Sequence, residues 1–510
     1  MTALSLRPSR DFGVWTMTHL APYPPFSLPQ RELRLAVSDV VPADAGAVGH
    51  IVFVGDELPE ASGLNAARAA GLGFSAKAGS SLVLPTGAGP VVVLIGGGER
   101  AEANPATLRD AAAIFARAVP SQVDLTLVAP ETSVDDQAAA AAMLEGAALA
   151  RYVYRIGADG PEAKLSSFTL VTEQSGLDAA DIGLAQGQLL VRATKLARDL
   201  AGTPGGILTA TRLGEVATQV GPQAGLAVEV FGEDALVEMG CGGLLGVNLG
   251  SEEPPAMIKL VYRPEGEPTG HLALVGKGIM YDAGGLAIKP GDEVHATMKN
   301  DMTGAAAILG AMTTLRELGC TSQVTGYLMC TDNMPGGGAL RLGDIIVMRG
   351  GKTVEVINTD AEGRLVMADA LVLATEENVD AIVDIATLTG AAMRTFGTEI
   401  AAVLGNNAEL IDQVKASAER VDEPVWELPL ARRYRKELDS IIADLRNMGG
   451  ANAGSITAAL FLEEFVNGIP WAHIDIAGAA QSASAEKWRN KGTTGFGTRL
   501  LIDLAMNFRK

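Results

Sequence analysis

The hydrophobic pattern divides the chain into two regions in which apolar strands alternate with helical segments. In the first, over 33–175, helical spacing predicts helices around 107–119 and 136–152. Short apolar runs between turn residues predict the strands HIVFVG, PVVVLIGGG, QVDLTLVAP and SSFTLVTE. This alternation predicts a small N-terminal α/β domain. A long helical pattern within 176–204 then predicts a helix that links this domain to the rest of the chain.

From 205 to 510 the alternation returns with stronger strands and with helices such as 303–318 and 454–466. The predicted strands are HLALVG, QVTGYLMCT, AIVDIATL, IAAVLG and AHIDIAG. Continuous apolar runs are typical of strands that are buried on both faces. We therefore predict an α/β protein whose larger C-terminal domain has a mainly parallel sheet covered by helices on both faces. The Pro-rich residues 1–32 are predicted to be an extended N-terminal extension.

Composition and charge narrow the classes of partner. A net charge of −20 argues against nucleic acid or an anionic membrane, because phosphate binding requires clustered Lys and Arg. Three cysteines cannot build a disulfide framework and suit a reducing compartment. The N-terminus lacks the apolar core of a signal peptide, and no run of about 18 apolar residues could span a membrane. We expect a cytoplasmic protein, with Met17 as an alternative first residue of translation.

Two glycine-rich motifs suggest nucleotide binding but are incomplete. Gly96–Ala101 matches G-x-G-x-x-G/A after a strand, yet ANPAT intervenes before the helix and no acidic residue ends the next strand. The sequence GGKT at 350–353 resembles part of a phosphate loop, but Ile346 stands where its first glycine belongs. We interpret GGKT as a turn between two strands. A nucleotide-dependent enzyme that uses Gly96–Ala101 remains an alternative.

The segment NTDAEGR, at 358–364, lies between an apolar strand and an apolar helix. Thr359 and Glu362 match a helix capping box, and Asp360 would be favoured by the helix dipole. Arg364 could then be an ordinary ion-pair partner. For this stretch alone, a purely structural interpretation is open.

A second segment, 275–301, also places charged residues between an apolar strand and a predicted helix. A strand brings Lys277 to a Gly-rich turn with Asp282, and Asp301 precedes a predicted helix. Together with Asp360 and Glu362 this places four carboxylates at strand ends or helix starts, where open α/β sheets build their sites.

Four converging carboxylates would repel one another unless cations lay among them, and two divalent metals are an economical solution. Lys289 and Arg364 would supply further positive charge. From the residues alone, we interpret Lys277 as a counter-charge to the carboxylates. The five histidines show no H-E-x-x-H pairing, which makes a His-built zinc site improbable.

Several motifs closely resemble the leucyl aminopeptidase family of dinuclear-metal cytosolic exopeptidases. They are VGKGIMYDAGGLAIKP, MKNDMTGAAA, NTDAEGRL, IATLTGA, WAHIDIAG and TTGFGTRLL, and the resemblance covers about 195–510. It implies a metal-dependent aminopeptidase that hydrolyses the N-terminal residue, preferably Leu, Met or another apolar residue, from peptides through a metal-bridging water. It also implies a homohexamer. A non-catalytic scaffold or regulatory relative is the other alternative.

The resemblance further implies roles for individual residues. Two divalent ions, Mn or Zn foremost and otherwise Co or Mg, would be held by Lys277, Asp282, Asp301, Asp360 and Glu362. Lys289 would stabilise the oxyanion, and Arg364 would anchor a bicarbonate ion. The substrate would be bound by Met298, Asn358, Thr387, Leu388 and Gly390.

Overall fold

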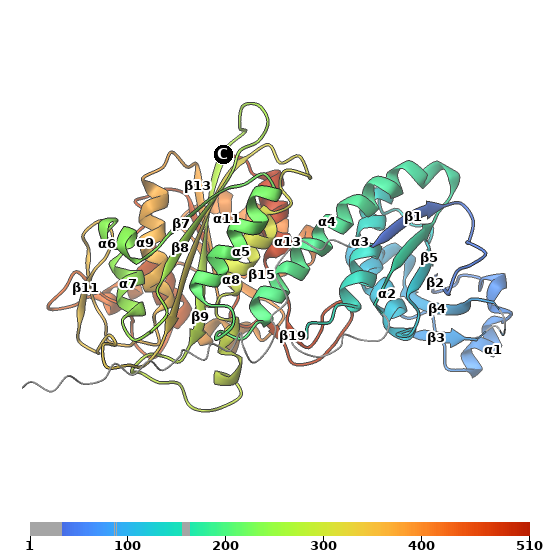
Figure 1. Ribbon diagram of the computed structural model, residues 1–510. Helices are drawn as coiled ribbons and strands as arrows, with labels where there is room; N and C mark the ends of the chain where they lie inside the picture. Colours follow the sequence, from blue (N-terminus) through green and yellow to red (C-terminus); the bar gives the residue numbers. More distant parts are fainter. Residues whose placement is uncertain (1–32, 86, 88, 156–163) are drawn as a thin grey trace, which may run out of the picture.

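The computed structural model describes residues 33–85, 87, 89–155 and 164–510 (Figure 1). The predicted Pro-rich extension over 1–32 lies outside these residues. Figure 1 shows a smaller N-terminal body and a larger C-terminal body, each with a sheet and packed helices. The predicted α/β class with two domains is confirmed. No helix among the described residues has the length and apolar character that crossing a bilayer requires.

The N-terminal domain contains a six-stranded sheet of order β1-β6-β5-β2-β4-β3, in which only β3 runs antiparallel to its neighbour. Its strands are β1 Arg34–Ser38, β2 Ala47–Phe53, β3 Ser81–Leu84, β4 Val91–Gly98, β5 Asp124–Val128 and β6 Ser167–Val171. Its helices are α1 Ala66–Gly71, α2 Pro105–Ala118 and α3 Asp136–Ala150. The sequence did not predict β1 and β3, because these edge strands are short and half exposed.

Chain packing accounts for the glycines of the 96–101 motif. A Cβ atom on Gly96 would lie 2.0 Å from the backbone oxygen of Lys77, and Gly98 has a φ of +80°. The 3-10 helix Arg100–Glu102 follows, and α2 begins only after the N-cap Asn104. No α-helix therefore starts at the third position of the motif, where a dinucleotide's phosphates would require one.

Two connections join the domains. Helix α4, Leu177–Gly202, runs between them, as Figure 1 shows. Trp488, from the C-terminal region, is buried in the core of the N-terminal domain. Arg117 of α2 donates hydrogen bonds to the backbone oxygens of Lys487 and Arg489. A loop of the larger domain is thus anchored in the smaller one.

The C-terminal domain contains an eight-stranded sheet of order β15-β14-β17-β13-β9-β10-β8-β7. Four of its strand pairs are parallel and three are antiparallel. Its strands are β7 Ala227–Phe231, β8 Ala256–Tyr262, β9 His271–Asp282, β10 Gln323–Asn333, β13 Ala381–Ala386, β14 Ala401–Gly405, β15 Val425–Glu427 and β17 Trp471–Asp475. The antiparallel β7 and β8 were not predicted.

Helices cover both faces of this sheet. They are α5 Ala210–Gln223, α6 Glu233–Glu238, α7 Gly242–Asn248, α8 Thr303–Met312, α9 Gly363–Thr375, α10 Gly390–Phe396, α11 Ala408–Val421, α12 Gly454–Glu463 and α13 Thr498–Asn507. Successive residues of β9 belong to different cores: Leu272 and Leu274 pack with α8 and α13, whereas Ala273 and Val275 pack with α7 and α9.

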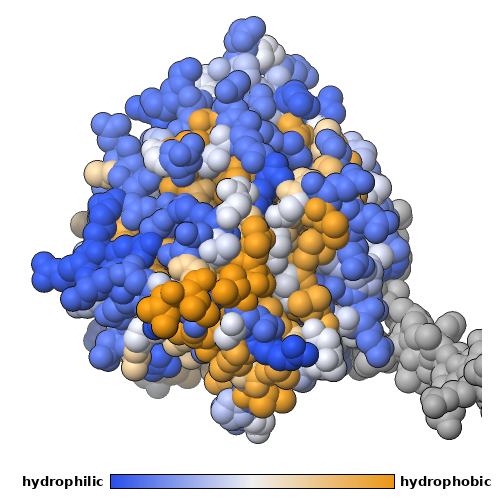
Figure 2. Space-filling model, turned by 90° about the vertical axis from the view of Figure 1, so that its left-hand side faces the viewer, coloured by the Kyte–Doolittle hydropathy of each residue, from blue (hydrophilic) through white to orange (hydrophobic). Residues whose placement is uncertain are grey.

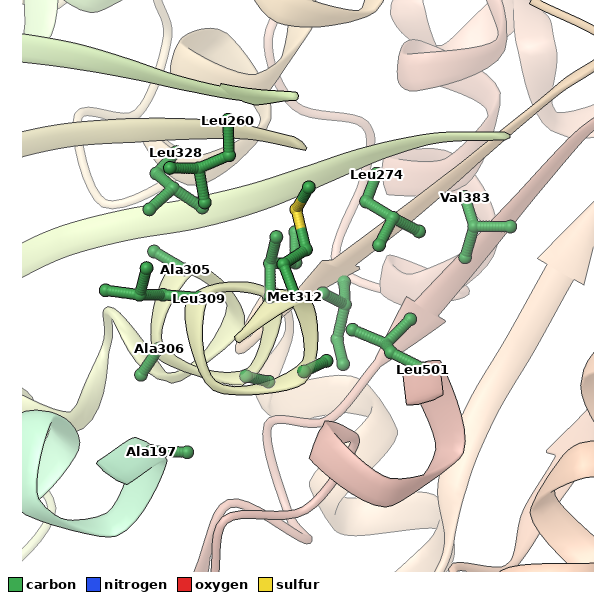
Figure 3. Close-up of a cluster of buried hydrophobic side chains, with 14 of the residues drawn as sticks. Ala197, Leu260, Leu274, Ala305, Ala306, Leu309, Met312, Leu328, Val383 and Leu501 are labelled. Atoms are coloured by element: carbon green, nitrogen blue, oxygen red, sulfur yellow. The ribbon is translucent and has the colours of Figure 1, made fainter. Parts of the chain in front are cut away.

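Helix α8 is buried along its whole length. In Figure 3, Leu260, Leu274 and Leu328 of the sheet and Leu501 of α13 surround its Ala and Leu side chains. A Cβ atom on Gly304 would lie 2.1 Å from the backbone oxygen of Ile385, so the helix start packs tightly on β13. This packing fixes Asp301 beside the ends of the central strands.

A small sheet contains β11 Ile345–Val347, β12 Thr353–Glu355 and β16 Leu445–Arg446, and its strand β12 leads to the NTDAEGR segment. Strands β11 and β12 are antiparallel, and the GGKT sequence leads from one to the other. The prediction that GGKT is a turn is confirmed. The end of β12 then delivers the 358–362 segment to the region where β9 ends.

Candidate metal centre

The predicted ligands converge in two ion-paired groups. The Lys277 Nζ atom lies 2.7 Å from Asp301 Oδ2 and 2.8 Å from Glu362 Oε1, and all three side chains are buried. Lys289 Nζ lies 2.9 Å from Asp282 Oδ2 and 2.5 Å from Asp360 Oδ1. One carboxylate oxygen each of Asp282, Asp360 and Glu362 lie within 4.8 Å of one another. The structure therefore brings all five predicted ligands and Lys289 together.

The turn after β9 folds back so that Lys289 returns to Asp282. Gly284 and Gly285 have φ values of +88° and +60°, which glycine adopts without strain. The backbone N–H of Gly284 donates to Asp282 Oδ1, and that of Lys289 donates to the oxygen of Ala283. A Cβ atom on Gly285 would lie 2.8 Å from Asn333 Oδ1, so the turn requires glycine there.

The capping-box interpretation of Thr359 and Glu362 is wrong. The Thr359 hydroxyl donates to the oxygen of Gly284 and accepts from the N–H of Ala287, at 2.7 and 2.8 Å. No side chain caps α9, and Glu362 extends to Lys277 instead. Tertiary partners in the turn after β9 thus replace the local ones. The adjacent Gly363 leaves room for this contact, because a Cβ atom there would lie 2.5 Å from Lys277 Cε.

Negative charge exceeds positive charge among these groups, four carboxylates to two lysines. Burial and the charge of Asp282 raise the pKa of Glu362 to about 8, although Lys277 opposes the shift. Burial raises the pKa of Asp301 to about 6, again against the effect of Lys277. Burial alone would lower the pKa of Lys277, but Asp301 and Glu362 raise it above its ordinary value. Additional cations would relieve this crowding of carboxylates.

The residues present fit divalent metal ions. Glu362 Oε2 is buried and has no hydrogen-bond partner among the residues that the structure describes, so this oxygen is available as a ligand atom. Carboxylate oxygens suit Mn, Mg, Zn or Co, and within the described residues no other group of three acidic, His or Cys side chains has comparable geometry. Lys277 could join the ligands only as a neutral amine, and its deprotonation near pH 7 costs roughly 4–5 kcal/mol.

Arg364 and Thr387 border the same cluster. The buried Arg364 guanidinium donates to the backbone oxygen of Asn447, and its Nε atom has no partner among the described residues. Burial lowers the pKa of Arg364 to about 10, which leaves it charged at neutral pH. The Thr387 hydroxyl donates to Asp301 Oδ1 at 2.7 Å, and its backbone oxygen accepts from Lys277 Nζ at 2.9 Å.

The other predicted substrate residues lie in segments next to these groups. Met298 belongs to the 3-10 helix His295–Asn300, directly before Asp301. Asn358 accepts from the backbone N–H of Asp360. Leu388 packs against the core under α9 and α12, and Gly390 begins α10. Their backbone positions place them around one end of the central strands.

Three polar residues that support the cluster were not predicted: Asn333, Asn447 and Asp475. Asn333 Nδ2 donates to Asp282 Oδ1 at 2.8 Å and to the oxygen of Thr359 at 3.0 Å. Asn447 Nδ2 donates to the backbone oxygen of Asn358. Asn333 could have been found, because it ends β10 beside the end of β9.

Comparisons with known proteins find related chains over most of the sequence. The models of the cytosol aminopeptidase family match its catalytic domain at residues 195–502 and its N-terminal domain at residues 56–156. A probable cytosol aminopeptidase of Streptomyces griseus subsp. griseus is 41% identical over 493 residues, covering 91% of this chain and 95% of that protein. Another, of Synechococcus sp., is 41% identical over 465 residues, covering 87% and 89%. The solved structure of the bottromycin maturation enzyme BotP in complex with Mn is 37% identical, with a TM-score of 0.83, and covers 91% of this chain and 99% of that one.

Proposed function

The chain belongs to the cytosol aminopeptidase family of hydrolases, and from that membership we propose that it removes an N-terminal Leu, Met or other apolar residue from peptides with a free N-terminus. One observation carries the proposal: Asp282, Asp301, Asp360 and Glu362 converge on Lys277 and Lys289. A nucleotide-dependent enzyme finds no comparable support, since chain packing accounts for Gly96 and Gly98.

The carboxylate cluster would hold two divalent ions. Asp282, Asp360 and Glu362 would hold one ion, and Lys277, Asp282, Asp301 and Glu362 would hold the other. When bound, the ions would supply a water of lowered pKa and a Lewis acid for the scissile carbonyl. Mn is our first choice and Zn our second, since the similar BotP was solved with Mn.

Lys289 and Arg364 would stabilise negative charge. Burial alone would lower the pKa of Lys289, but Asp282 and Glu362 raise it above its ordinary value, so it stays protonated and cannot act as a base. It would therefore stabilise the developing oxyanion. Arg364 is charged and buried with a free Nε–H, which suits a small anion such as bicarbonate.

The first residue of the peptide would lie against Met298 and the 387–390 segment, with Asn358 bordering the site. The apolar side chains of Met298 and Leu388 favour Leu or Met, but one methylene changes the rate only about 10–200-fold, so several apolar residues should be accepted.

Metal removal tests the proposed function. The purified chain, stripped of metal by a chelator, should lose its hydrolysis of leucine p-nitroanilide and regain it with Mn²⁺ or Zn²⁺. The readout is the rate of p-nitroaniline release, and circular dichroism confirms that the stripped chain stays folded. A folded chain that is inactive with every metal and every N-terminal residue would instead favour a non-catalytic scaffold or regulatory relative.

We also propose that the chain forms a homohexamer. Seen from the side of α6, α7 and β11, Figure 2 shows a broad gathering of apolar side chains, and Val237, Ile345 and Val347 on these elements are exposed. A large exposed apolar surface is typical of an interface between subunits.

Light scattering by the purified chain should give six times the 52.7 kDa chain mass. Val347→Asp should reduce that mass, whereas Val83→Asp, at an exposed valine of the N-terminal domain, should not; a wild-type monomer would contradict the proposal.

The three cysteines are all free and buried, which fits the cytoplasmic location that we propose and that cell fractionation would check.

A further inference from the structure

A buried carboxylate outside the metal cluster holds the turn between β13 and α10. Asp475, the last residue of β17, is 1% exposed. Its Oδ1 atom accepts from the backbone N–H groups of Leu388 and Thr389 at 3.1 and 3.3 Å. Its Oδ2 atom accepts from the Thr389 hydroxyl at 2.6 Å. Three donors of one turn thus depend on a single side chain.

The opposite side of the same turn contacts the metal cluster. The Thr387 backbone oxygen accepts from Lys277 Nζ, and the Thr387 hydroxyl donates to Asp301 Oδ1. We propose that Asp475 is a positioning residue, which fixes the 387–389 turn and thereby orients Lys277 and Asp301 as metal ligands and shapes the apolar subsite. The subsite part of this inference rests on the proposed function, whereas the metal-binding part does not.

The strand that carries Asp475 is joined to β13 by a buried polar network. His473, two residues earlier on β17 and on the same face, pairs through Nδ1 with the buried Asp384, which also accepts from Trp471 Nε1. Burial alone would lower the pKa of His473, but Asp384 and Asp475 raise it above its ordinary value, although Arg364 opposes them. The ion pair with Asp384 thus fixes the imidazole of His473 on the strand that carries Asp475.

A second support comes from α12. The Thr389 hydroxyl lies 2.8 Å from the hydroxyl of Ser455, at the start of this helix. It also accepts from the N–H of Ala392, which caps α10. The turn is therefore fixed between α10, α12 and β17 and has little freedom to shift while Asp475 is in place. Loss of the carboxylate would leave the three donors of this turn without their acceptor. Because a buried donor without an acceptor is costly, the backbone of the turn would shift toward new partners.

The test compares Asp475→Ala with Asp369→Ala. Asp369 of α9 is a matched control, since it is also buried and its carboxylate accepts hydrogen bonds from the backbone N–H groups of Leu244 and Arg349. Removing outer partners of metal ligands typically weakens metal affinity or activity about 10–100-fold. We expect Asp475→Ala to weaken Mn²⁺ affinity by that factor, measured by titration with detection of free Mn²⁺, and Asp369→Ala to leave it at the wild-type value.

Kinetics add a second readout. Asp475→Ala should lower kcat/KM for leucine p-nitroanilide more than for alanine p-nitroanilide, because the larger side chain depends more on the 387–389 turn. If Asp475→Ala does not fold, Thr389→Val replaces it in the test. This variant removes the hydroxyl that donates a hydrogen bond to Asp475 Oδ2. Thr389→Ser keeps a hydroxyl and should therefore retain the wild-type Mn²⁺ affinity. Mn²⁺ affinity unchanged in Asp475→Ala, or in Thr389→Val, would overturn the inference. A wild-type chain that binds Mn²⁺ but hydrolyses no peptide or anilide would contradict the proposed function. The comparison of Mn²⁺ affinity between the variants would still test the role of Asp475.

Discussion

Glu362→Ala should lower kcat/KM for leucine p-nitroanilide on the order of 10³-fold or more, even with excess Mn²⁺. Glu362 is one of two carboxylates, with Asp282, that would contact both ions. Its Oε1 atom lies beside Lys277, and its buried Oε2 atom has no hydrogen-bond partner among the described residues. Lewis-acid stabilisation of a transition state is worth several kcal/mol, and each 1.36 kcal/mol is a factor of ten in rate. The measurement is steady-state hydrolysis, combined with elemental analysis that should find fewer than two ions per chain.

The same variant should remain folded. Burial and Asp282 raise the pKa of Glu362 to about 8, so near pH 7 the substitution removes a mostly protonated side chain from the metal-free protein. Lys277 keeps its ion pair with Asp301. Glu376→Ala is the matched control, because Glu376 follows the same helix but pairs with Arg349 outside the cluster. Near-wild-type hydrolysis by Glu362→Ala would show that the carboxylate cluster is not the catalytic metal site.

The sequence located the carboxylates because their positions follow from a rule of the fold. Buried parallel strands end at one edge of the sheet, so Asp282 and the segment around Asp360 were expected to meet there as neighbouring strand ends. They do meet, but β12, which leads to Asp360, belongs to the separate three-stranded sheet and not to the sheet of β9. Lys277 was interpreted from the residues alone as a counter-charge, and in the structure it does pair with Asp301 and Glu362. The expected repulsion among four carboxylates thus implied bound metal cations from the sequence alone.

The supporting residues escaped prediction because long-range strand pairing creates their roles. Asp475 reaches Leu388 only because β17 pairs with β13, and Asn447 reaches Asn358 only through β16 and β12. A single Asn or Asp in the sequence has an ordinary local explanation, such as a turn or a cap. The same limit produced the wrong capping box, since the partners of Thr359 lie some 70 residues away at Gly284 and Ala287.

Lys289→Met should lower kcat about 10²–10³-fold, the usual loss when one oxyanion-stabilising group is removed, with a smaller change in KM. The side chain of Lys289 is 17% exposed at the edge of the cluster, whereas that of Lys277 is 3% exposed within it. This position would let Lys289 face a substrate and Lys277 face the ions. Because the pKa of Lys289 is raised above its ordinary value, the loss should not depend on pH near neutrality.

Metal content separates this effect from that of Glu362→Ala. Lys289→Met should still bind two ions, because no ligand is lost, and Lys352→Met is the matched control, since Lys352 pairs with Glu464 outside the cluster. In the metal-free protein, however, Lys289 separates Asp282 from Asp360, so the variant should be less stable there and regain stability when Mn²⁺ is added. A variant that loses metal but keeps kcat when saturated would show that Lys289 is only a counter-charge.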